Sequence, residues 1–154
     1  MSIGLKLNKA EAIIVDLDGT LTNCDHRVHL VEKEHQEWKA FYNAMGEDAL
    51  NAWCKRIIDT FSKEDVSIIL ITGRPSNYRD LTMDWLSRHN IKYCNLYMRD
   101  QDDYRSDAII KREFYERKVK DEYETLFVLD DRKSVVEMWR ELGLTCLQPQ
   151  WGEF

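Results

Sequence analysis

The sequence predicts an α/β fold, in which a parallel sheet of about five strands is covered by helices on both faces. Short runs of β-favouring apolar residues alternate along the 154 residues with stretches at helical spacing. Strands and helices in this alternation form right-handed βαβ units, so the strands run parallel. Polar residues directly follow three of the apolar runs, where an open α/β sheet places its functional site. We expect one domain over residues 1–154, three-layered α/β/α and Rossmann-like.

Five segments are predicted as strands from their β-branched and other apolar residues. The first begins at Ala12 and ends before Asp16. The last is short, as expected for an edge strand, and Pro149 lies beyond it. The five predicted strands are residues 12–15, 66–72, 93–98, 126–129 and 145–148.

The segments between these strands carry apolar residues at helical spacing. Residues 23–28 are predicted as a loop, and residues 29–44 and 47–61 as two helices separated by Gly46. Together they form a small helical insert at about residues 28–62, after the first strand. The other predicted helices are residues 76–89, one that Ser106 caps and that runs to Phe114, and residues 135–142 with Gly143 behind them.

Composition narrows the class of protein. The four cysteines have no C-x-x-C spacing, so we expect reduced thiols in a cytoplasm rather than a zinc site or disulfides. No apolar run approaches the roughly 20 residues of a membrane span, and the N-terminus lacks the apolar core of a signal peptide. A net charge of −6 argues against a large surface coated by nucleic acid. It leaves open a small pocket in which arginines hold one phosphate.

The polar residues after the strands predict a site at one edge of the sheet. Asp16 and Asp18 follow the first strand, and this spacing suits a hard divalent cation or carboxylate chemistry. Taken alone, Asp-x-Asp-Gly can equally be a strand followed by a turn. Because parallel strands share one carboxyl edge, three such strand ends together favour a functional site. The other members are Thr72 and Arg74 after the second predicted strand, and Asp130 and Asp131 after the fourth.

Four elements resemble the haloacid dehalogenase-like phosphatase superfamily in order, spacing and position. They are DLDGTLT at residues 16–22, ITGR at residues 71–74, Lys111 on a later helix and LDD at residues 129–131. The resemblance covers nearly the whole chain. It implies the corresponding fold and a phosphomonoester hydrolase.

The resemblance also implies a role for each residue. Asp16 would be the nucleophile that forms an aspartyl-phosphate, and Asp18 the general acid and then the general base. Thr72 would hydrogen-bond the phosphoryl group, and Lys111 would neutralise its oxygens. Asp107 lies four residues before Lys111. There it would orient the lysine or a neighbouring arginine, or form an ordinary ion pair on the helix surface.

Mg²⁺ is the implied cofactor. The resemblance places it among Asp16, the backbone carbonyl of Asp18, and one of Asp130 and Asp131. Asp130 is favoured as the direct ligand, whereas Asp131 either contributes as well or caps the helix that follows. The ion would offset the repulsion between an anionic nucleophile and an anionic substrate.

A longer string resembles the 3′-phosphatase domains of phage polynucleotide kinase/phosphatases. It adds Arg27, YMR at residues 97–99, D-x-R-x-D-x-x-x-K-x-E at residues 103–113 and DDR-x-x-VV-x-MWR at residues 130–140. This resemblance implies removal of 3′-phosphate from DNA or RNA ends during nucleic-acid repair. It makes Arg27 and Arg74 candidates for contacts to the substrate phosphate, although each can instead form a structural ion pair.

The chain contains no G-x-x-x-x-G-K-[ST] phosphate loop, so we expect no phosphorylation of 5′ ends. Any kinase or ligase partner would then be a separate protein, and a phage-encoded enzyme would act in the host cytoplasm. A nucleotidase or other small-molecule phosphatase is the main alternative. A phospho-accepting receiver fits less well, because its acceptor aspartate does not lie two residues before a second acid. The complete residue set argues against an inactive binding module.

Two further groups of residues have alternative interpretations. His26 and His29 share a loop, and we expect them to be exposed rather than to bind metal. Aromatic residues in the predicted insert could stack on a nucleobase, but aromatics at helical spacing are more often core. They are Trp38, Phe41, Tyr42 and Trp53.

Overall fold

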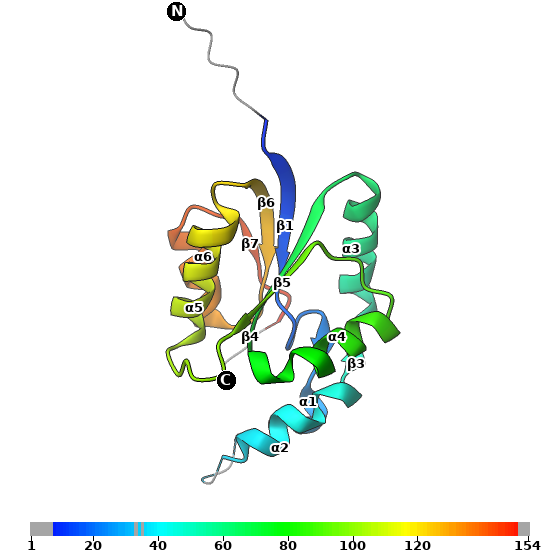
Figure 1. Ribbon diagram of the computed structural model, residues 1–154, viewed down its shortest axis with the longest axis vertical. Coiled ribbons are helices and arrows are strands. Elements are labelled where there is room, and N and C mark those ends of the chain that lie inside the picture. The colour runs from blue at the N-terminus through cyan, green and yellow to red at the C-terminus, as the bar shows by residue number, and fades with distance from the viewer. Residues whose placement is uncertain (1–7, 33, 35, 151–154) are drawn as a thin grey trace, which may run out of the picture.

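Five parallel strands form the central sheet, as the sequence predicts. The structure, a computed structural model, describes residues 8–32, 34 and 36–150 (Figure 1). A central strand is flanked by two pairs of others, so the first strand of the chain is paired along both edges. In sheet order the strands are β5 (Asn95–Arg99), β4 (Ser67–Pro75), β1 (Ala10–Val15), β6 (Tyr123–Leu129) and β7 (Cys146–Leu147).

Helices cover both faces of the sheet (Figure 1). Two short turns extend them: the 3₁₀ turn η2 (Ser76–Tyr78) and the π-helical turn η3 (Tyr115–Val119). The three-layer α/β/α architecture is therefore confirmed. The covering helices are α3 (Ala52–Lys63) and α4 (Arg79–Arg88) on one face, and α5 (Asp107–Phe114) and α6 (Lys133–Glu141) on the other.

Buried residues alternate between the two faces of β1. Ile13 and Val15 belong to the core under α3 and α4, whereas Ala12 and Ile14 belong to the core under α6. All four side chains are at most 1% exposed. A strand buried on both faces requires a continuous apolar run, and this requirement explains the sequence pattern that predicts it.

A tryptophan connects each core to the carboxyl edge of the sheet. Trp85 of α4 and Trp139 of α6 are both fully buried. Trp85 Nε1 donates to the backbone carbonyl of Asp48 at 2.8 Å, and Trp139 Nε1 donates to Oδ2 of Asp130 at 3.2 Å. Each core therefore holds one acidic residue in place at that edge.

The segment that follows β1 differs from its prediction. Within the predicted loop of residues 23–28 lies a helical turn, α1 (Asp25–Val28), preceded by the short strand β2 (Thr22–Asn23). β2 pairs antiparallel with β3 (Ala49–Leu50). Because this pairing takes up the residues before Asn51, the helix predicted from residue 47 begins only at Ala52.

The helix predicted over residues 29–44 is also wrong in extent. Among the described residues of this segment, the helical structure consists of α2 (Trp38–Asn43) and the 3₁₀ turn η1 (Ala44–Glu47). The residues just before α2 are mostly glutamate or glutamine and offer no apolar face to bury. Residues 33 and 35 lie outside the described residues. α3 packs on the sheet through Cys54 and Ile58, so only the part of the predicted insert before α3 lies outside the three layers.

Two predicted helix ends are confirmed. Ser106 Oγ accepts a hydrogen bond from the backbone N–H of Ile109 at the start of α5. Gly143 follows α6 with a φ of +82°. No helix in residues 8–32, 34 and 36–150 is long and apolar enough to cross a membrane.

Gly19 is the other glycine with positive φ, at +83°, and it lies directly against the carboxylate of Asp131. Left-handed backbone costs a residue with a Cβ about 1–2 kcal/mol. We expect Gly143→Ala to lower the free energy of unfolding by that amount and no more, because open space surrounds its Cβ position. Gly19→Ala should lose more, since its Cβ would displace Asp131. Urea unfolding of both variants tests this order, and an equal loss would contradict it.

Candidate active site

The carboxyl ends of β1, β4 and β6 open into a cavity of about 1240 Å³. Parallel pairing places the polar residues that follow these strands on the same edge of the sheet. Of the predicted site residues, only Arg27 is absent from the cavity lining. The others that line it are Asp16, Asp18, Thr72, Arg74, Asp107, Lys111, Asp130 and Asp131.

Three buried carboxylates form a cluster in this cavity. Asp16, Asp130 and Asp131 each offer an oxygen, and these three oxygens lie within 4.8 Å of one another. The buried ammonium of Lys111 donates to Asp16 Oδ1 at 2.8 Å and to Asp130 Oδ2 at 2.7 Å. Burial would lower the pKa of Lys111, but the charges of Asp130 and Asp16 outweigh it and raise that pKa. The lysine therefore stays charged and joins α5 to β1 and to the residue that follows β6.

One cation does not neutralise three acids. Burial, together with the charge of Asp130, raises the pKa of Asp16 well above its ordinary value. The same two causes raise the pKa of Asp131 to about 6. Carboxylates packed this closely are unstable in the ionised form unless further positive charge lies among them.

The oxygen atoms in the cluster fit a divalent cation. Oδ2 of Asp131 is buried, and among the described residues it has no hydrogen-bond partner. Asp130, in contrast, accepts from Lys111 and Trp139 at Oδ2 and from the backbone N–H of Arg132 at Oδ1. A buried oxygen without a partner, beside two other carboxylates, is a ligand position for a hard cation such as Mg²⁺. The sequence favours Asp130 as the direct ligand. The contacts in the structure favour Asp131 instead, and we infer that Asp131 is the better direct ligand.

Asp18 lies in a different electrostatic environment. Its Oδ1 accepts from Arg27 Nη2 at 2.5 Å and from Arg74 Nη2 at 2.6 Å. Burial alone would raise the pKa of Asp18, but the charges of Arg74 and Arg27 outweigh it and hold the pKa below its ordinary value. Two carboxyl groups separated by a single residue thus have their pKa values shifted in opposite directions, which is typical of acid–base catalytic pairs.

Asp48 completes this ion network, and sequence reasoning missed it. Its buried carboxylate accepts from Arg27 Nε and Nη2, each at 2.7 Å, and from Arg74 Nη2 at 3.1 Å. His26 Nε2 lies 2.8 Å from Oδ1 of the same residue. No local pattern marks Asp48, because its partners lie 21 to 26 residues away along the chain.

The two arginines differ in their access to the cavity. Arg27 is fully buried and lies outside the cavity lining, so its contact to a substrate phosphate stays a prediction that no contact in this arrangement supports. Its guanidinium is occupied by Asp18 and Asp48, which is the alternative of a structural ion pair. Arg74 makes the same two ion pairs but also lines the cavity, so its contact to a substrate phosphate stays a prediction.

Thr72 and Asp107 line the same cavity as Asp16 but make different contacts. Thr72 ends the continuous buried run of β4, and its Oγ1 accepts from the backbone N–H of Arg74 at 3.2 Å. Asp107 pairs with Arg99 and with Arg132, the latter at 2.8 Å, rather than with Lys111. Of the interpretations open for Asp107, orientation of a neighbouring arginine therefore describes its contacts.

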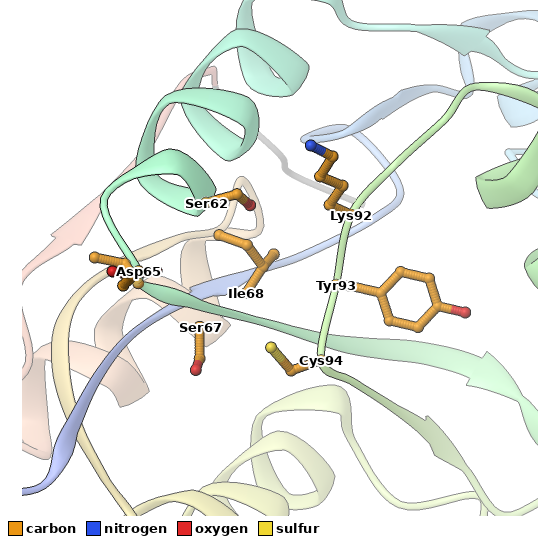
Figure 2. Close-up of a pocket in the computed structure, with 8 residues that line it drawn as sticks. Ser62, Asp65, Ser67, Ile68, Lys92, Tyr93 and Cys94 are labelled. Carbon is orange, nitrogen blue, oxygen red and sulfur yellow. The ribbon is translucent and has the colours of Figure 1, made fainter.

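A second cavity, of about 280 Å³, lies near the amino ends of β4 and β5 (Figure 2). Its lining includes Asp65, Ser67, Lys92 and Cys94, contributed by the segments that lead into those strands. This is the edge of the sheet opposite the carboxylate cluster. The cavity therefore takes no part in the site described above.

The parallel sheet carries its acids at the end of the central strand, and a family model of a haloacid dehalogenase-like phosphatase domain matches the chain, which is therefore an enzyme of that class. The class C acid phosphatase from Bacillus anthracis, solved with tungstate bound, shares the fold with a TM-score of 0.62. Its sequence is 20% identical, over 82% of this chain and 54% of that one. This likeness confirms the predicted fold, and the family model confirms the predicted phosphatase class.

Within this class, the chain belongs to the family described as the polynucleotide kinase PNKP phosphatase domain, which matches residues 10–154. The solved Pnkp1/Rnl/Hen1 complex contains a chain that is 36% identical, with a TM-score of 0.83, over 96% of this chain. A chain in a solved Pnkp1/Rnl/Hen1 RNA repair complex is 37% identical, with a TM-score of 0.80, over 95% of this chain. A protein of Autographa californica nuclear polyhedrosis virus, named as a bifunctional polynucleotide kinase/RNA ligase, is 26% identical over 135 residues, or 86% of this chain.

These relatives are longer proteins. The chain spans 48% and 44% of the two chains in the complexes and 18% of the viral protein. Because the match covers only part of each relative, the predicted resemblance is confirmed for the phosphatase domain alone.

Mg²⁺ should stabilise the protein through Asp131. The pKa of Asp131 is about 6 in the folded protein and about 3.9 in an unfolded chain. Its contribution to the free energy of unfolding is therefore fully present below about pH 3.9 and is lost as the pH rises through about 6. In metal-free buffer at pH 7.5, Asp131→Asn should therefore raise the free energy of unfolding, by on the order of 1 kcal/mol. Mg²⁺ should raise the Tm of the unmodified protein more than that of the variant.

The matched control for this measurement is Asp65→Asn. Asp65 is exposed at the opposite edge of the sheet, and asparagine tolerates its φ of 59°. Its response to Mg²⁺ should equal that of the unmodified protein. A variant at Asp131 that is destabilised without metal, or that keeps the full response to Mg²⁺, would show that the cluster holds no cation there.

The ion network around Asp18 should contribute strongly to stability. Asp48→Asn is expected to lower the free energy of unfolding by about 3–5 kcal/mol, because two buried arginines lose a carboxylate that they share. Asp84→Asn is the matched control, since the Asp84–Arg88 pair is exposed and such helix pairs contribute only about 0.3–0.5 kcal/mol. Urea unfolding measures both losses, and similar values for the two variants would rule out a structural role for the network.

Proposed function

We propose that the protein removes 3′-phosphate from polynucleotide ends, in a Mg²⁺-dependent reaction that passes through an aspartyl-phosphate on Asp16. The observation that carries the chemistry is the pairing of two carboxyl groups in opposite environments. Asp16 lies among acids beside a buried lysine, whereas Asp18 lies between two arginines. Family membership carries the choice of a polynucleotide as substrate.

In the first step, an oxygen of Asp16 attacks phosphorus, and the bond from phosphorus to the 3′ oxygen breaks. Asp18 transfers a proton to that oxygen, so a 3′-hydroxyl leaves. In the second step, Asp18 accepts a proton from a water molecule whose oxygen attacks the phosphorus. The Asp16–phosphorus bond breaks, inorganic phosphate leaves, and Asp16 returns as a carboxylate.

Two neighbouring side chains orient the carboxylate of Asp16. Thr20 Oγ1 donates to Asp16 Oδ2 at 3.1 Å while Lys111 holds Oδ1 at 2.8 Å. These contacts point the carboxylate in one direction, and Lys111 also lies where charge builds on the phosphoryl oxygens. The Thr72 hydroxyl can donate to a phosphoryl oxygen from the end of β4.

The protonation of Asp18 follows from substrate binding. In the substrate-free protein the arginines keep Asp18 ionised, which suits its role as base in the second step. A phosphate dianion beside it adds like charge and attracts Arg74, and both effects raise the pKa of Asp18. Asp18 then becomes able to hold the proton that the first step needs.

Asp16, Asp131 and the backbone carbonyl of Asp18 would hold the Mg²⁺, with Asp130 oriented by Lys111 and Trp139. When bound, the ion supplies positive charge that offsets the repulsion between nucleophile and substrate.

The names of the relatives support a nucleic-acid substrate. Two relatives lie in Pnkp1/Rnl/Hen1 complexes, one of them described as an RNA repair complex, and the viral relative is named as a kinase and RNA ligase. We therefore propose that this protein acts on DNA or RNA ends beside a kinase or a ligase. The cavity, at about 1240 Å³, also exceeds the roughly 300–1,000 Å³ typical of small-ligand sites.

The test compares a 3′-phosphorylated oligonucleotide with 3′- and 5′-mononucleotides, with Mg²⁺ and with EDTA. We expect turnover of the oligonucleotide with Mg²⁺ only, and a loss of about 10³-fold or more in Asp16→Asn. The variant should remain folded, because Lys111 keeps its bond to Asp130.

Two results would refute separate parts of this proposal. Efficient turnover of mononucleotides without turnover of oligonucleotides would make the enzyme a nucleotidase. Appreciable Mg²⁺-dependent activity in folded Asp16→Asn would show that another group is the nucleophile.

A further inference from the structure

The outer part of the active-site cavity carries aromatic side chains that the proposed chemistry does not use. Trp38 and Tyr42 of α2 line the same cavity as Asp16, and so does Tyr104 from the loop before α5. Trp38 is 44% exposed and Tyr104 is 89% exposed. Figure 1 shows α2 beyond the carboxyl ends of the strands, apart from the helices that cover the sheet.

The two aromatics of α2 belong to a packed stack. The Trp38 and Tyr42 rings are 6.0 Å apart at an angle of 27°, and Tyr42 lies 5.2 Å from Tyr78. Behind them, buried Phe41 packs edge-on against Trp38 at 5.8 Å, and the Arg27 guanidinium lies 4.2 Å from the Phe41 ring. The stack is thus supported by the buried ion network, yet nearly half of Trp38 remains accessible. Such a preordered aromatic surface loses little entropy when a planar ligand binds.

The arginines around the cavity are largely neutralised by carboxylates. Arg99 and Arg132 both pair with Asp107. Arg105 pairs with Asp103 and with Glu113. The chain as a whole carries a net charge of −6. Attraction for a polyanionic backbone is therefore weak here, so recognition of a polynucleotide requires contacts of another kind.

Stacking supplies such contacts. Every nucleobase has an aromatic face, and stacking on protein aromatics supports binding to single strands without a strong sequence preference. In a single strand the terminal base is free to leave its neighbour and stack on protein. The cavity is larger than one phosphate requires and extends from the carboxylate cluster to α2.

We propose that Trp38, supported by Tyr42, is the surface on which the nucleobase at the 3′-phosphorylated end of a single strand stacks. Tyr104 contacts the same nucleotide from the loop before α5. This subsite rests on the proposed polynucleotide 3′-phosphatase activity. It assigns the discrimination between a nucleic-acid end and a small phosphomonoester to α2.

The experiment uses the full chain with Mg²⁺ and two 3′-phosphorylated trinucleotides. One carries a normal base on its 3′-terminal nucleotide, and the other carries an abasic analogue there. We expect a kcat/KM about tenfold higher for the normal substrate, expressed mainly in KM. Trp38→Ala should reduce this ratio to near one, and Trp38→Phe should keep most of it.

Trp53→Ala is the matched control. Trp53 is 42% exposed, as Trp38 is, but it lies on α3 and does not line the cavity. Its ratio should equal that of the unmodified protein. Circular dichroism checks the fold of each variant, and Tyr104→Ala, a change at an 89% exposed side chain, should lower the ratio without affecting folding.

Each other outcome overturns the proposal at a defined point. Equal turnover of the two trinucleotides by the unmodified protein removes the subsite but leaves the 3′-phosphatase activity. A tenfold ratio retained in folded Trp38→Ala places base recognition elsewhere. If Trp38→Ala does not fold, the two other variants decide the question. A ratio unchanged in both Trp38→Phe and Tyr104→Ala also places base recognition elsewhere. Turnover of p-nitrophenyl phosphate with no turnover of either trinucleotide refutes the polynucleotide substrate itself.

Discussion

The site depends on one buried ammonium group. Lys111 reaches from α5 between Asp16, which follows β1, and Asp130, which follows β6. Without a cation at this point, buried carboxylates on neighbouring strands would repel each other across a short distance. The lysine is compatible with burial because neighbouring acids stabilise its charge, Asp130 first and Asp16 second. A single electrostatic requirement therefore links the positions of α5, β1, β6 and Asp16.

A second buried network serves the neighbouring carboxylate. Arg27 and Arg74 lie between Asp18 and Asp48, and Asp48 is held in turn by Trp85 of the hydrophobic core. Buried ion pairs often contribute little net stability compared with apolar packing. Here the network gives Asp18 an environment that favours its ionised form, whereas Asp16, with only Leu17 between them, lies in one that does not. The buried charges thus preorganise the site, and electrostatic preorganisation is usually the largest contribution to stabilising a transition state.

How far the sequence predicts this arrangement depends on the distance between partners. Strand ends are readable because apolar runs are local and parallel pairing gathers their ends, so Asp16, Thr72 and Asp130 are predicted to meet. Asp48 is not, because its role exists only through arginines brought near by β2–β3 pairing and the insert. For the same reason the sequence leaves two interpretations of Arg27 open, a phosphate contact and a structural ion pair, and only the structure shows its buried pair with Asp18. Short elements such as β2 and α1 lack enough residues to display a period.

The position of β1 in the sheet has a consequence for how the enzyme comes into existence. Its two neighbours are β4, beginning at Ser67, and β6, ending at Leu129. Pairings between segments this far apart in sequence form late, after the cost of closing long loops has been met. Until β6 pairs with β1, Asp16, the proposed nucleophile, follows a strand with one edge unpaired and lies apart from Asp130 and Asp131. The carboxylate cluster and the central sheet are therefore completed together.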